Sequence, residues 1–210
     1  MATHYSQRLS EDNAAIAFID HQTGLLVNCR DQDHNTLKTN IRALCQMTAV
    51  LDLPAVITAS VPEGPNGPIM PDIIELLPKA PVVNRAGEIN AWDSPEFRSA
   101  IEATGRKKLI MSGIVTDVCV MFPAISAVAD GYDVYAVIDA SGTWDNTVLQ
   151  ASMHRMSQAG VKVATWASIL AELMRDWRNP KGAALGQIMA GHLSYGWVVD
   201  SFMSQQKDRT

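Results

Sequence analysis

The chain has 210 residues, of which 47% are hydrophobic and 19% are charged, and its formal net charge is −5. This length predicts one domain, and the apolar fraction excludes an intrinsically disordered chain. The acidic balance argues against a nucleic-acid-binding protein, which would carry clustered lysines and arginines. The charged fraction falls short of the roughly 25% of an average soluble domain. A smaller part of the surface than usual is therefore expected to carry charged side chains.

Short apolar runs alternate with helical patterns along the chain. The runs predict six strands, at residues 14–19, 54–59, 81–84, 108–112, 133–138 and 161–165. Apolar residues near a 3.6-residue period predict helices at residues 37–51, 71–77, 95–104, 119–130, 147–159 and 169–176. Strands that alternate with helical crossovers predict an α/β fold with a mostly parallel sheet, covered by helices on both faces in three αβα layers.

The segment 109–129 carries a single charge, Asp117, and resembles a membrane span in composition alone. Its periodicity changes midway, so a buried strand followed by a buried helix is the better interpretation. Pro123 is suited only to the first turn of a helix, so the regular helix either starts near Phe122 or bends there.

We expect a single domain over residues 1–210, with its core at 14–176. The last stretch, 177–210, is too short for a second domain but carries several tryptophan, tyrosine and aliphatic side chains. It predicts a C-terminal arm that packs on the core or on another subunit. Together with the shortage of charge, this arm predicts a homo-oligomer.

No apolar signal segment follows the N-terminal residues, and the three cysteines are odd in number and widely spaced. That spacing is not a disulfide framework and favours a reducing compartment. We expect a cytoplasmic protein that binds neither nucleic acid nor membrane and whose partner is a small-molecule substrate.

Three chemically active side chains fall just after predicted strands. Asp20 ends the first strand, Arg85 follows the third, and Cys119 lies a few residues past the fourth. Ligands of open parallel sheets bind beyond the carboxyl ends of the strands, so these residues should converge at one edge. Each has a simpler interpretation alone: a turn residue, a surface charge and a core cysteine.

Together the three suit nucleophilic catalysis. A thiol near a helix N-terminus, beside a cation, is expected to ionise more readily. Asp20 would take the thiol proton and later pass it to a leaving group or water. Backbone N–H groups in the turn from Val115 to Cys119 would face an oxyanion.

Two motifs resemble the isochorismatase-like cysteine hydrolases, a superfamily with a Rossmann-like fold. They are Phe-Ile-Asp-His-Gln at residues 18–22, followed by Gly-Leu-Leu at 24–26, and Gly-Ile-Val-Thr-Asp-Val-Cys-Val at 113–120. Further segments are most similar to the YcaC-like branch, whose substrate is undefined. These segments are residues 64–68, 89–93, 139–143 and 175–179.

The resemblance implies a six-stranded parallel sheet in the order 3-2-1-4-5-6 and a large homo-oligomer, an octamer. It implies an Asp–Lys–Cys triad that maps to Asp20, Arg85 and Cys119. It also implies a cis peptide between Val115 and Thr116, which would aim the N–H groups of Val115 and Cys119 at the oxyanion. The nucleophilic cysteine points to hydrolysis of a small amide or related C–N compound through a thioester.

Two departures from related enzymes matter. The triad lysine is arginine here, and arginine cannot release a proton at neutral pH, so its role would be electrostatic. The Asp/His metal cluster of nicotinamidases is missing from residues 58–63, and the five histidines show no ligand spacing. We therefore expect no metal and no cofactor.

The substrate pocket is expected to include four polar or aromatic side chains near the triad, with Trp92 equally suited to simple packing. They are Gln22, Glu88, Asn90 and Trp92. Two other functions remain open. One is a binding protein in which the change from lysine to arginine ended turnover. The other is a thiol redox sensor based on oxidation of Cys119.

Overall fold

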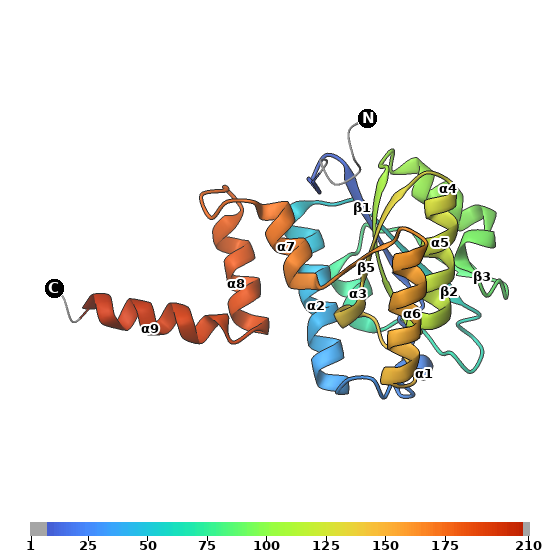
Figure 1. The fold of residues 1–210 in the computed structure, drawn as a ribbon, viewed down its shortest axis with the longest axis horizontal. Coiled ribbons are helices and arrows are strands. Elements are labelled where there is room, and N and C mark those ends of the chain that lie inside the picture. The colour runs from blue at the N-terminus through green and yellow to red at the C-terminus, as the bar shows by residue number, and fades with distance from the viewer. Residues whose placement is uncertain (1–7, 208–210) are drawn as a thin grey trace.

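The computed structural model describes residues 8–207 as one sheet between two layers of helices (Figure 1). The strands are β1 (Ala14–Ile19), β2 (Ala55–Ser60), β3 (Val82–Arg85), β4 (Lys108–Gly113), β5 (Asp133–Val137) and β6 (Lys162–Ala164). All neighbours pair in parallel, in the order β3-β2-β1-β4-β5-β6. The predicted fold class and strand order are confirmed.

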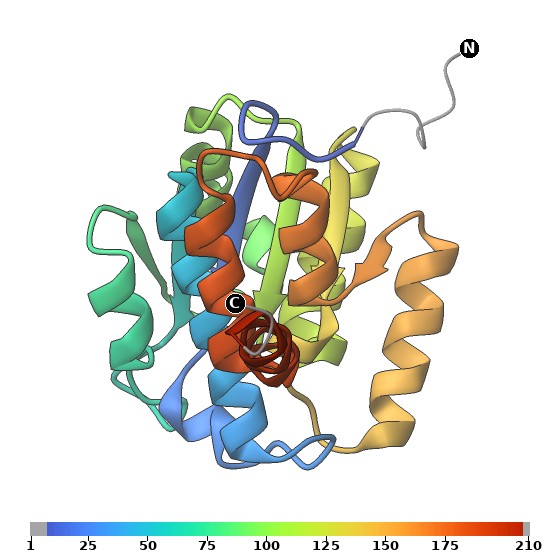
Figure 2. The same ribbon diagram turned by 90° about the vertical axis from the view of Figure 1, so that its left-hand side faces the viewer.

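The α-helices of the described chain fall between and after these strands. They are α1 (Thr23–Leu26), α2 (His34–Leu51), α3 (Pro71–Leu76), α4 (Pro95–Ala103), α5 (Met121–Ala129), α6 (Asn146–Gln158), α7 (Trp166–Met174), α8 (Gly182–His192) and α9 (Tyr195–Lys207). Helices α2, α3, α7 and α8 lie on one face of the sheet, and α4, α5 and α6 on the other (Figures 1 and 2).

The central strands have no polar face because helices cover both sides of the sheet. Every residue of β1 and β4 is buried, including Lys108 and Ser112. This double coverage accounts for the continuous apolar runs in the sequence and places the core along β1 and β4.

Local caps move several helix boundaries from their predicted positions. Helix α2 begins three residues early because the Asp33 side chain accepts the Thr36 N–H. Helix α7 also begins early, at a capping box formed by Thr165 and Ser168. Helix α5 begins at Met121, so Pro123 falls in its first turn, where its missing N–H leaves no hydrogen bond unmade.

The C-terminal arm consists of α8 and α9. Helix α8 packs against α2 and α7, whereas α9 contacts α8 and projects away from the body of the molecule (Figure 1). Trp177, before α8, stacks on Tyr195 with ring centroids 5.8 Å apart. The N-terminal and C-terminal residues on which the targeting expectations rest, 1–7 and 208–210, lie outside the described residues.

Candidate active site

Asp20, Arg85 and Cys119 meet at the carboxyl edge of the sheet. Asp20 follows the last residue of β1, and Arg85 is the last residue of β3. Cys119 lies in a π-helical turn, η3 (Thr116–Val120), that follows β4 and leads into α5. All three are buried, with exposed fractions of 0%, 3% and 9%. The predicted convergence of these three residues is found in the structure.

Asp20 and Arg85 form a two-pronged ion pair. Arg85 Nη1 donates to Asp20 Oδ1 at 2.9 Å, and Nη2 donates to Oδ2 at 2.8 Å. Paired N–H donors match the two oxygens of a carboxylate, which makes this geometry both strong and directional. Arg85 therefore orients the Asp20 carboxylate in a way that a lysine could not, because a lysine has no such fork.

The guanidinium has two further partners. Nη1 also donates to Thr58 Oγ1 at 3.1 Å, and Nε donates to the Glu88 carbonyl at 3.2 Å. Four of the five N–H donors of Arg85 are thus held by named acceptors. Thr58 was not predicted as a site residue, and only its position in β2 between the other two strands could have indicated it.

The backbone at Asp20 turns sharply out of the sheet. Asp20 has φ 53°, a left-handed conformation that aspartate tolerates better than most residues. Its N–H donates to the Thr58 carbonyl at 2.9 Å, which anchors the turn to β2. Gly113 ends the neighbouring strand beside this turn, where a Cβ would collide with the Ile19 carbonyl oxygen.

The Cys119 thiol hydrogen-bonds to the Asp20 carboxylate, and its pKa is raised. Burial is the largest cause, the Asp20 charge adds to it, and the opposing effects of the Val115 hydrogen bond and the Arg85 charge are smaller. The Arg85 charge lowers this pKa, as expected of a nearby cation, but burial and the Asp20 charge outweigh it, so the expectation of a readily ionised thiol is wrong. The thiol rests protonated beside a base.

The turn that carries Cys119 is tied together by the Val115 carbonyl. It accepts the N–H groups of Val118 at 3.2 Å, Cys119 at 2.8 Å and Val120 at 3.3 Å. The Cys119 N–H, predicted as an oxyanion donor, therefore has an internal partner at rest. The role of Val115 and Cys119 as oxyanion donors stays a prediction.

The cis peptide lies between Ile114 and Val115, so its prediction at Val115–Thr116 is wrong by one residue. Ile114 still belongs to the sheet region, since its N–H donates to the Ile19 carbonyl and it bridges to Gly142. The chain leaves the sheet only after it. Thr116 is held separately, with its N–H and hydroxyl both donating to the Gly142 carbonyl.

Gln22, predicted to line the pocket, instead fastens a loop. Its amide nitrogen donates to the carbonyls of Ser60 and Gly67, at 3.1 and 2.6 Å, and its amide oxygen accepts the Ser60 N–H at 3.0 Å. The side chain is fully buried. Its hydrogen-bonding groups are committed to the loop after β2, so the prediction that Gln22 contacts substrate is not supported by its position.

The other predicted pocket residues also have structural partners. The Trp92 indole N–H donates to Asp130 at 2.7 Å, and its ring packs edge-on against Tyr132. The Asn90 side chain caps the turn Ala91–Asp93 and donates to Ser126. Glu88 contributes its backbone carbonyl to Arg85, while its carboxylate, whose pKa is lowered chiefly by backbone N–H groups, bonds the Gly87 N–H. Of these, only Glu88 touches the triad.

A histidine lies buried next to the site without joining the triad. His21 Nε2 is 3.1 Å from both Ser112 Oγ and the Ala140 carbonyl, and Nδ1 has no partner among the described residues. Burial lowers its pKa to about 4, so the ring is neutral at physiological pH. It supports the ends of β4 and β5 rather than acting as a base.

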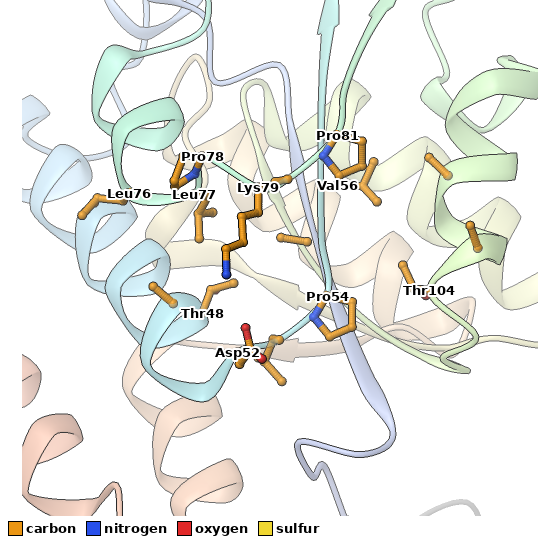
Figure 3. Close-up of a pocket in the computed structure, with 16 residues that line it drawn as sticks. Thr48, Asp52, Pro54, Val56, Leu76, Leu77, Pro78, Lys79, Pro81 and Thr104 are labelled. Carbon is orange, nitrogen blue, oxygen red and sulfur yellow. The ribbon is translucent and has the colours of Figure 1, made fainter.

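A cavity of about 470 Å³ lies elsewhere, at the amino edge of β2 and β3 (Figure 3). Its walls are mainly aliphatic and proline side chains from the ends of α2, α3 and α4, with Lys79 extending over it (Figure 3). No triad residue lines it. Over residues 8–207 we find no group of three histidine, cysteine or acidic residues suited to a metal, and no helix long and apolar enough to cross a membrane.

Comparisons with known proteins agree with this geometry. The Isochorismatase domain family matches residues 14–168. The Escherichia coli K12 protein named "Probable hydrolase YcaC" is 45% identical over 172 residues, which cover 82% of this chain and 83% of that protein. The Pseudomonas aeruginosa YcaC structure superposes with a TM-score of 0.92 at 44% identity, covering 95% of this chain and 99% of that one.

The crystal structure of E. coli YcaC matches with a TM-score of 0.93 at 42% identity, over 97% of this chain and all of that one. It is described as an octameric hydrolase of unknown specificity. The family match spans the triad and all six strands. The chain therefore belongs to the isochorismatase family of hydrolases and is similar to its YcaC proteins.

Proposed function

We propose that this hydrolase cleaves a small amide or related C–N compound through a thioester on Cys119. The observation that carries the proposal is the buried Asp20–Arg85 ion pair, with the Cys119 thiol bonded to the same carboxylate. A nucleophile and an oriented base in hydrogen-bond contact are the signature of covalent catalysis. The gathering of three buried ionisable side chains at one strand edge, with the pKa of Cys119 raised, adds support.

The chemistry proceeds in two steps. Asp20 takes the Cys119 proton as the sulfur attacks the carbonyl carbon, and the C–N bond then breaks as Asp20 returns the proton to the departing amine. Water next attacks the thioester and gives a proton to Asp20. The C–S bond breaks, the acid product leaves, and the thiol regains its proton.

Arg85 acts without releasing a proton, since a guanidinium stays charged at neutral pH. Its fork keeps the Asp20 oxygens aligned, and its charge offsets the negative charge that builds on sulfur. The raised pKa of Cys119 is compatible with this role, because the thiolate is needed only during attack. The same raised pKa argues against a redox sensor, which depends on a thiolate at rest.

A relative that binds a small amide covalently adds support. The P. aeruginosa YcaC structure contains covalent acrylamide. Acrylamide is a small amide that also adds to thiols, so a family member at 44% identity takes a compound of the proposed class into covalent contact.

The test is a panel of small amides, carbamates and ureas assayed with wild type, Cys119→Ala, Cys29→Ala and Cys45→Ala. Cys29 and Cys45 are buried thiols with raised pKa values, away from the ion pair, and serve as matched controls. We expect turnover to vanish only in Cys119→Ala. Turnover that survives in that variant would refute the nucleophile assignment.

The Arg85→Lys variant separates an adapted site from a decayed one. Lysine cannot reproduce the fork to Asp20, so hydrolysis should fall in a site adapted to arginine. A gain of hydrolysis in Arg85→Lys would instead identify a binding protein whose turnover was lost with the ancestral lysine.

We further propose that the chain forms a homo-octamer through its arm, expected over residues 177–210. In helix α9, Trp197 is 75% exposed and Phe202 is 59% exposed. Large apolar side chains exposed together on one element indicate a surface that another subunit covers. E. coli YcaC, with which the chain aligns over 97% of its length, is octameric. Light scattering should give eight times 22.8 kDa. A double Trp197→Ser, Phe202→Ser variant should dissociate, and a wild-type monomer at micromolar concentration would overturn the proposal.

The cysteines also favour a compartment. Cys29, Cys45 and Cys119 are all unpaired thiols, as expected of a protein in a reducing environment. We propose the cytoplasm, and cell fractionation that finds the protein outside it would contradict this.

A further inference from the structure

Thr58 lies at the centre of the site without being one of its reacting groups. It sits in β2 between β1 and β3, opposite Ile19 on one side and Val83 on the other. Its neighbours on those strands lead directly to Asp20 and Arg85. The side chain is fully buried, so its hydroxyl must find its partners within the protein.

The Thr58 hydroxyl donates one hydrogen bond and accepts another. Its Oγ1–H donates to the Val83 carbonyl at 2.8 Å. A hydroxyl has one donor and two lone pairs, so the oxygen remains an acceptor. It accepts from Arg85 Nη1 at 3.1 Å. The orientation of Thr58 is therefore set by β3, and Thr58 in turn sets the position of the guanidinium.

The main chain of Thr58 holds the other half of the ion pair. Its carbonyl accepts the Asp20 N–H at 2.9 Å, at the point where Asp20 leaves the sheet with a positive φ. One residue thus restrains Asp20 through its backbone and Arg85 through its side chain. Over residues 8–207, no other residue hydrogen-bonds to both.

An ion pair alone would leave the guanidinium free to tilt about the carboxylate. The bond from Nη1 to Thr58, with that from Nε to the Glu88 carbonyl, fixes its plane. We infer that Thr58 is a positioning residue, which holds the Asp20–Arg85 pair so that the Asp20 carboxylate meets the Cys119 thiol. The inference rests on the proposed triad and adds a fourth side chain to it.

The test is the pH dependence of Cys119 alkylation by iodoacetamide, located by peptide mass mapping, in wild type, Thr58→Val and Thr58→Ser. Valine keeps the shape and loses the hydroxyl, whereas serine keeps the hydroxyl. Thr48→Val is the matched control, since Thr48 is also buried and donates to a carbonyl, that of Leu44 at 2.7 Å, but lies in α2. Folding of each variant is checked by circular dichroism and thermal melting.

A hydrogen bond to a charged group is worth about tenfold or more in an equilibrium or rate. The Asp20 charge raises the pKa of the Cys119 thiol, so we expect Thr58→Val, which loosens Asp20 from the thiol, to move the alkylation curve to lower pH and to speed alkylation at pH 7 about tenfold. Thr58→Ser should restore the rate to within about threefold, and Thr48→Val should keep the wild-type curve while losing stability. If Thr58→Val fails to fold, Thr58→Ala replaces it with the same expectation.

A folded Thr58→Val or Thr58→Ala protein with the wild-type curve would overturn the inference. A Thr58→Ser curve displaced from wild type as far as that of Thr58→Val would overturn it as well, because the hydroxyl would then not be the group that positions the pair. Alkylation requires no turnover, so the result is independent of whether any amide is hydrolysed. Loss of the hydrolase proposal and loss of the Thr58 inference are therefore separate outcomes.

Discussion

Each edge of the sheet carries an ion pair, and the two pairs differ in burial and in what surrounds them. At the carboxyl edge, the side chains of Asp20 and Arg85 are 1% and 0% exposed and lie beside a thiol. At the amino edge, Asp133 joins the buried Lys108 and also Lys162, and the side chains of Asp133 and Lys162 remain 17% and 25% exposed. Removing two charges from water is costly, so a buried pair contributes little net stability. A fully buried pair next to a nucleophile is better explained by function.

The same contrast holds for cavities. The 470 Å³ cavity lies at the amino edge, where its walls are aliphatic and no nucleophile is present. The triad lies at the opposite edge. This cavity therefore gives no indication of where the chemistry takes place, whereas the arrangement of chemical groups points to the carboxyl edge.

The largest expected difference between the two edges is in catalysis. Asp20→Asn removes the base and should lower amide hydrolysis on the order of 10⁴-fold, as removal of a triad member does elsewhere. Asp133→Asn should stay within about twofold of wild type, because its change is confined to the amino edge. The measurement is kcat/KM on the best amide of the panel. Equal losses in the two variants would erase the contrast between the edges.

A second difference is expected in stability. Arg85→Met leaves the Asp20 carboxylate buried without its partner, and the free energy of unfolding should fall by about 4 kcal/mol. Lys162→Met removes a partly exposed member of its pair and should cost about 1 kcal/mol or less. Urea unfolding at pH 7.5 measures both. A milder effect for Arg85→Met than for Lys162→Met would contradict the burial argument.

A third difference concerns acid. His21 has a folded pKa of about 4, below its ordinary value near 6.5, so the unfolded chain binds the proton more tightly. The contribution of neutral His21 to the free energy of unfolding is therefore fully present above about pH 6.5. As the pH falls toward 4, up to about 3 kcal/mol of it is lost. Unfolding free energies of wild type and His21→Gln should therefore converge between these pH values.

Asp133 provides the control for that window. Burial opposes its ionisation, but Lys108 and Lys162 outweigh this and lower its pKa, so its contribution is lost only below its ordinary value near 3.8. Asp133→Asn should accordingly keep the wild-type slope between pH 6.5 and 4. If His21→Gln keeps that slope too, buried His21 is not the group that titrates.

Much of this architecture follows from local patterns. The six strands were predictable because both faces of a parallel sheet are covered, which makes each strand a continuous apolar run, whereas their order followed from the family resemblance. Asp20, Arg85 and Cys119 were predictable because they follow strands that end at one edge. The first residues of the helices were harder to predict, because Asp33 and Thr165 cap their helices upstream of the first apolar residue of the predicted pattern.

What the pattern missed depends on contacts between distant segments. Gln22 was expected to touch substrate, but the loop after β2 folds back and occupies its amide. The Cys119 pKa is raised rather than lowered because burial and the Asp20 charge outweigh the Arg85 charge, and the burial of this turn follows only from the packed fold. Thr58 has an unremarkable place in an apolar strand, and only the three-dimensional pairing of β2 with β1 and β3 gives it partners.

The most direct test of the central claim is the mass of the protein quenched during turnover of its best amide substrate. The account predicts that wild type gains the acyl group, with loss of the amine, on the peptide that contains Cys119. In Cys119→Ala neither the adduct nor turnover should be found. An acyl group on any other residue, or turnover that persists in Cys119→Ala, would contradict the account.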